Sequence, residues 1–128
     1  MIGILGGYQT DYARNWTKEG ADVTAMTAEV VSGTLAAAGV DPEDIGVIHV
    51  GNAFGQLFTG QGHLGAMPAT VEPRLAGVPA SRHEAACASG GIALLAAMAD
   101  LEAGRYDVAL VLGVELERSV SGGQAADY

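Results

Sequence analysis

The segment from about Ala88 to Ala103 predicts a helix with almost no polar surface. Between Gly90 and Met98 every residue is glycine, alanine, isoleucine, leucine or methionine, and polar side chains stand only near the ends. A helix that covers one face of a single sheet carries a polar outer stripe, whereas a helix that is apolar all round is buried on every side. We therefore expect a second covering layer from another domain or subunit, and an exposed apolar patch on an isolated copy.

The other segments alternate between short apolar runs and helical patterns. A helix is predicted from near Thr24 to Ala38, ended by Gly39, and the glycine-rich stretch 52–77 predicts a loop followed by a short or distorted helix. Four apolar runs predict strands: Met1–Gly7, Ile45–Val50, Pro79–Ala86 and Val108–Val114. This alternation predicts an α/β fold, βαβαβαβ, with a mixed and mostly parallel sheet built through right-handed crossovers.

Length and charge limit the classes of function. The 128 residues suffice for one domain, and 49% hydrophobic against 16% charged residues indicate a globular chain. With 15 acidic and 6 basic residues, the net charge of −9 argues against binding to nucleic acid or to an anionic membrane surface. No apolar run reaches about 18 residues and no leader pattern opens the chain, so we expect a cytoplasmic protein.

Cys87 is the only cysteine and therefore the only candidate nucleophile of its kind. It stands where a predicted strand meets the predicted apolar helix. Unpaired backbone N–H groups at the first turn of a helix stabilise a thiolate, and the small neighbouring residues let a substrate approach. A buried structural cysteine is the alternative interpretation, and the small residues around this turn favour a nucleophile only slightly.

Residues 83–91, HEAACASGG, resemble the nucleophile motif of the thiolase family, in particular its sterol-carrier-protein-X-like and archaeal acetyl-CoA acetyltransferase branches. The resemblance covers nearly the whole chain in the expected order. It includes the opening segment Ile2–Tyr12, AAAGVDPEDIGVIHVGNA at 36–53, GQGHLGAM at 60–67 and VALVLGVELE at 108–117.

The resemblance implies an N-terminal thiolase half-domain. In such enzymes two halves of the pattern βαβαβαββ pack as an α/β/α/β/α sandwich, and the helix after the nucleophile lies in its middle layer. Cys87 would take an acyl group from a 3-ketoacyl-CoA during thiolysis, or from acetyl-CoA during condensation. Coenzyme A thioesters would be the substrates, and no other cofactor is expected.

The chain also departs from the family pattern. The resemblance implies that the activating histidine, a second cysteine and an oxyanion-binding His or Asn belong to a C-terminal half, which we expect to lie outside residues 1–128. We expect residues 1–128 to be an incomplete N-terminal half-domain, without the final strand, the loop domain and the C-terminal half. It would act with a C-terminal half or second subunit in a homo- or hetero-oligomer. The alternatives are a component of a ketoacyl synthase-type condensing enzyme and a non-catalytic scaffold subunit.

Three histidines are weighed as partners of Cys87. Four strand residues span about 13 Å, so His83 is not expected to activate the thiol and is assigned to a subunit contact or to solvent. His49, within an apolar run, is expected to be a hydrogen-bonded core histidine. For His63, in a glycine-rich loop, an oligomer contact is favoured over a position in the site. The spacing shows no metal-ligand pattern, so no metal is expected. Substrate-binding residues are not identified.

Overall fold

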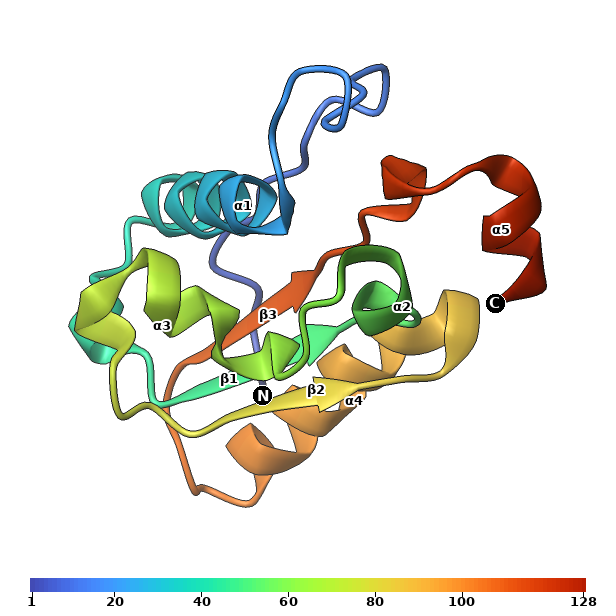
Figure 1. Ribbon diagram of the computed structural model, residues 1–128. Coiled ribbons are helices and arrows are strands. Elements are labelled where there is room, and N and C mark those ends of the chain that lie inside the picture. The colour runs from blue at the N-terminus through green and yellow to red at the C-terminus, as the bar shows by residue number, and fades with distance from the viewer.

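The computed structural model describes all 128 residues and contains one sheet of three parallel strands (Figure 1). β1 (Val47–Gly51) lies in the centre, with β2 (Ala80–His83) on one side and β3 (Ala109–Gly113) on the other. The helices are α1 (Val23–Ala38), α2 (Gly55–Thr59), α3 (Met67–Val71), α4 (Ser89–Glu102) and α5 (Gly122–Asp127). The predicted α/β class, with a helix directly after Cys87, is confirmed.

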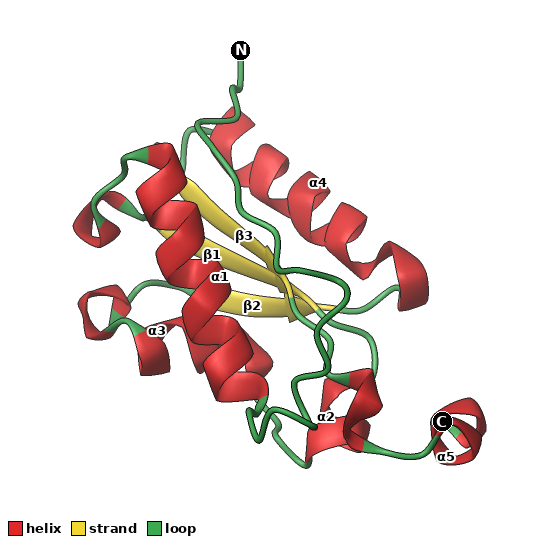
Figure 2. Ribbon diagram, turned by 90° about the horizontal axis from the view of Figure 1, so that it is seen from above, coloured by secondary structure: helices red, strands yellow, loops and turns green.

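The two faces of the sheet are covered differently. α1 and α3 lie on one face and α4 lies on the other (Figure 2). The main hydrophobic core is on the side of α1, where Val31, Ile48 and Leu75 are almost fully buried. Because side chains alternate along a strand, the neighbour of Ile48, His49, projects toward α4 instead. The sheet therefore has an apolar core on one face and a partly polar contact on the other.

α4 contacts the sheet through a narrow face of small residues. Ala93 and Ala97 are buried, whereas Ile92, Leu94 and Leu95 leave 41%, 43% and 59% of their surface exposed. The apolar patch expected on an isolated copy is therefore present in this chain. Its position on the outer side of α4 follows from the single sheet, which covers only one face of the helix.

The main helices end where their sequence signals predict. The Asp22 side chain accepts a hydrogen bond from the Ala25 N–H at 2.9 Å and so caps the start of α1. Gly39, with φ of +63°, ends the same helix in the left-handed conformation that favours glycine. The loop predicted over 52–77 contains two short helices, α2 and α3, joined by turns.

The strand predicted at Met1–Gly7 is wrong. This segment is irregular, and Ile4 and Leu5 are exposed. A strand needs a neighbour to pair with, and no strand lies beside this segment, so the sheet has three strands and is wholly parallel. The strand predicted at Pro79–Ala86 is also shorter in the structure, because β2 ends at His83. α5 was not predicted.

No helix combines the length and the apolar character that crossing a membrane requires.

Candidate functional site

Cys87 lies in the connection between β2 and α4, at the carboxyl end of the parallel strands. It occupies the middle of a short 3₁₀ turn, Ala86–Ala88, two residues before α4 begins. Its side chain is exposed and its thiol is free. The carboxyl edge is the side on which open parallel sheets bind ligands, so the thiol stands where a substrate can reach it.

The turn that carries Cys87 is held by side-chain hydrogen bonds. Ala86 has a φ of +48°, in the left-handed region that side chains disfavour. The buried Ser89 hydroxyl donates to the Ala86 carbonyl at 2.7 Å and accepts from the Ala85 N–H at 2.9 Å. A Glu84 carboxylate oxygen accepts from the Ala86 N–H at 2.6 Å. These three bonds stabilise a backbone conformation that alanine alone does not favour.

The N-terminal turn of α4 is open beside the cysteine. No side chain caps this helix end, and a Cβ added at Gly90 or Gly91 would meet no atom within 4 Å. On the opposite side the turn is tightly packed, because a Cβ at Gly51 would lie 2.7 Å from the Gly90 Cα. The glycines thus place the first turn of α4 directly on the end of β1 and leave its outer side free.

A buried asparagine joins the loops at the same edge of the sheet. The Asn52 side chain donates to the Val114 carbonyl and accepts from the Gly55 N–H at 2.8 Å. The Glu115 carboxylate accepts from the Ala53 N–H at 2.7 Å, which ties the segment after β3 to the segment after β1. Sequence reasoning missed Asn52. The only available signal was a polar residue directly after a buried strand.

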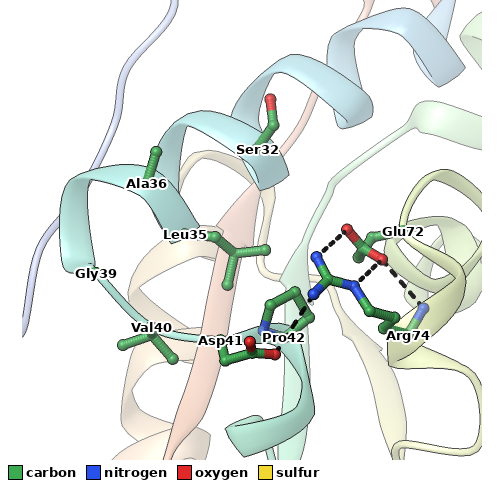
Figure 3. A pocket seen from close by; sticks show the side chains of 9 residues that line it. All are labelled: Ser32, Leu35, Ala36, Gly39, Val40, Asp41, Pro42, Glu72 and Arg74. Carbon is green, nitrogen blue, oxygen red and sulfur yellow. Dashed lines mark hydrogen bonds and ion pairs between the residues drawn. The ribbon is translucent and has the colours of Figure 1, made fainter.

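Two of the surface hollows have lining residues that do not include Cys87. One, of about 450 Å³, lies between the end of α1 and the turn at residues 72–74 (Figure 3). There Arg74 forms ion pairs with Glu72 and Asp41, and its hydrogen bond holds the pKa of Glu72 below the usual range. The other, of about 380 Å³, is lined partly by Phe54, Leu57 and Arg82.

The histidines do not gather around Cys87. His49 is buried and hydrogen-bonded, as predicted, with Nε2 at 3.2 Å from Asp100 Oδ2. Its Nδ1 lies 2.9 Å from His83 Nε2. His83 therefore makes a contact within the chain, whereas a subunit contact or a position in solvent was expected from the sequence. Burial, and then the neighbouring His83, lower the pKa of His49, while Asp100 opposes the shift. His63 is exposed, with φ of +54°, in the loop before α3.

Comparison with known proteins gives consistent matches. The family "Thiolase, N-terminal domain" matches residues 2–126. An acetyl-CoA acetyltransferase of Methanocaldococcus jannaschii is 37% identical over 114 residues, which cover 89% of this chain and 28% of that relative. An acetyl-CoA acetyltransferase of Methanothermobacter thermautotrophicus is 33% identical over 114 residues, 89% of this chain and 29% of that relative. The chain therefore spans less than a third of the length of these relatives.

Proposed function

Because this chain belongs to the thiolase N-terminal domain family, we propose that it is the nucleophile-bearing part of a thiolase-type acyltransferase, in which Cys87 carries the acyl group. The observation that carries the proposal is the exposed, free thiol of Cys87 on the hydrogen-bonded turn between β2 and α4. The names of the two relatives, both acetyl-CoA acetyltransferases, support acyl-CoA thioesters as the substrates.

The proposed reaction begins with attack of the Cys87 thiolate on a carbonyl carbon of the acyl-CoA substrate. With acetyl-CoA, a bond forms between the Cys87 sulfur and the acyl carbon, the bond to the coenzyme A sulfur breaks, and coenzyme A leaves with a proton. With a 3-ketoacyl-CoA, the thiolate attacks the 3-keto carbon, the carbon–carbon bond to the acetyl-CoA unit breaks, and that unit takes a proton on its C2 carbon and leaves as acetyl-CoA. Both routes give the same kind of thioester on Cys87. Coenzyme A is part of the substrate, and no metal is proposed.

No histidine of this chain is placed to act as a base for this thiol. None of its three histidines is hydrogen-bonded to Cys87, and His49 and His83 bond to each other instead. We therefore propose that the activating groups belong to a C-terminal half, in the same polypeptide or in a second subunit. The outer face of α4 is exposed, and this chain covers only 28% and 29% of the length of the two relatives. Both observations support a further part of the protein that packs on α4. Such an assembly would be a cytoplasmic oligomer of lipid metabolism.

Acyl labelling of the assembled protein tests this proposal. Radiolabelled acetyl-CoA should transfer its acetyl group to the wild-type protein, and Cys87→Ala should abolish that transfer. Ser32→Ala is a matched control, because this exposed hydroxyl on α1 bonds only within its own helix. Unchanged labelling of Cys87→Ala would refute the claim that Cys87 is the nucleophile. Absence of labelling in the wild-type assembly would favour a scaffold subunit.

A further inference from the structure

One polar cluster lies within the contact between the sheet and α4. It consists of Asp100, His49, His83 and Ser81, which we name the histidine bridge. His49 Nε2 lies 3.2 Å from Asp100 of α4, His49 Nδ1 lies 2.9 Å from His83 Nε2, and Ser81 Oγ lies 3.0 Å from the same His83 nitrogen. His49 is only 5% exposed, so the centre of the bridge is shielded from water.

The bridge joins the two elements that flank Cys87. His83 ends β2, which leads into the turn of the cysteine, and Asp100 lies on α4, which follows it. The residues of α4 that are buried on this face are small, namely Ser89, Ala93 and Ala97. Small side chains bury little apolar area and stabilise a helix weakly. The bridge therefore adds a polar contact that links β2, through His49 of β1, to α4.

The geometry is satisfied when both imidazoles are neutral. The His49 Nε2–H then donates to Asp100, and His49 Nδ1 accepts from the His83 Nε2–H. A proton added to His49 Nδ1 would face the hydrogen on His83 and break that bond, unless His83 changes its tautomer. Protonation of both rings would place two cations in direct contact. Acid therefore weakens the bridge.

The groups around His49 do not prevent this effect. β2 contributes His83 and the uncharged Ser81, and α4 contributes Asp100. The other oxygen of Asp100 lies 3.5 Å from the Arg105 guanidinium, which competes for its charge. On β3, Val111 pairs with His49, and that strand has no titratable residue. Burial and His83 both lower the pKa of His49.

We propose that the histidine bridge positions Cys87 by fixing β2 to α4, and that protonation of the His49–His83 pair releases this contact. The first half of the inference rests on the proposed acyl transfer, because only a nucleophile needs to be positioned. The release of α4 in acid is a property of the fold and is measured separately.

Hydrogen–deuterium exchange of the assembled protein tests the release. Exchange rates of α4 amides, corrected for intrinsic pH dependence and compared with those of α1, should rise at least about fivefold between pH 7.5 and 5.5. His49→Gln and His83→Gln keep a hydrogen-bonding amide that does not titrate, so either variant should flatten this dependence. His63→Gln, the same substitution outside the bridge, should retain it.

Acetyl transfer to Cys87 tests the positioning. The acid limb of its pH profile should move in His83→Gln and remain unchanged in His63→Gln. The inference would be overturned if amide exchange in α4 of the wild type did not depend on pH. It would also be overturned if both bridge variants kept the pH dependence of the wild type. Release of α4 in a wild-type protein that is never acylated would refute the proposed function and leave the acid-sensitive contact supported. If His83→Gln is acylated with the same acid limb of the pH profile as the wild type, the bridge does not position Cys87, and only that part of the inference is refuted.

Discussion

Replacement of Gly51 by alanine should destabilise the protein through a clash with the first turn of α4. A Cβ at Gly51 would lie 2.7 Å from the Gly90 Cα, the Gly90 N and the Ser89 carbonyl oxygen. Carbon atoms in ordinary contact are about 3.5–4.0 Å apart, so the helix must move by roughly 1 Å. All three atoms belong to the backbone, and no side chain can rotate away to relieve the contact.

The expected cost is about 2 kcal/mol in the free energy of unfolding, which is typical of overpacking against a structure that cannot yield. The smaller conformational entropy of an unfolded chain with alanine offsets part of this cost, by less than about 1 kcal/mol. For a chain of this size, about 2 kcal/mol lowers the melting temperature by about 8 °C. Because the helix moves at Ser89 and Gly90, the alkylation rate of Cys87 by iodoacetamide should also change.

Gly113→Ala is a matched control for this prediction. Gly113 pairs with Gly51 across the sheet, and a Cβ there would meet no atom within 4 Å. Its melting temperature should stay within about 2 °C of the wild type, as for an uncrowded site, and the alkylation of Cys87 should not change. Melting by circular dichroism and thiol alkylation of the same assembled samples provide both readouts. Equal melting temperatures for the two variants would refute the close packing of α4 on β1.

Three further predictions concern the polar contacts. Asn52→Ala should lower the free energy of unfolding by about 1–3 kcal/mol in urea titrations, because the Val114 carbonyl and the Gly55 N–H lose a buried partner; an unchanged midpoint would contradict this. Ala86→Gly should raise the free energy of unfolding by about 1 kcal/mol, because glycine adopts a φ of +48° without strain. A lower free energy of unfolding would show that the turn is not strained. Arg14 lowers the pKa of Glu29 from 4.5, so Glu29 contributes stability above pH 4.5 that is lost as the pH falls through the lower folded value. Arg14→Gln should make the acid loss of stability shallower, and an identical pH profile of unfolding would contradict the pair.

The two long helices, α1 and α4, were predictable from local sequence patterns. The helix expected from near Thr24 to Ala38 begins at Val23 and ends at Ala38, before the left-handed Gly39. The helix expected over about 88–103 is α4, Ser89–Glu102. In both cases a long run with a consistent pattern and a glycine near its end sets the boundary, and neither signal depends on distant residues.

The strands and the site environment depended on distant residues and were predicted less well. An apolar run such as Met1–Gly7 becomes a strand only beside a partner, and sequence alone does not show whether that partner is present. The contact of His49 with Asp100 joins positions 51 residues apart and requires the sheet, its register and α4 to be in place. The motif made Cys87 the candidate nucleophile, which stays a prediction. The hydrogen bonds of Ser89 and Glu84 that hold its turn depend on a backbone conformation that no local sequence pattern predicts.

Peptide mapping of the acylated protein tests the central claim most directly. The assembled protein would be incubated with acetyl-CoA, quenched in acid to preserve thioesters, digested and analysed by mass spectrometry. The account predicts an acetyl group on the peptide that contains Cys87, released by added coenzyme A. An assembly that exchanges acetyl groups with coenzyme A while Cys87 stays unmodified, or carries the acetyl group on another residue, would contradict it.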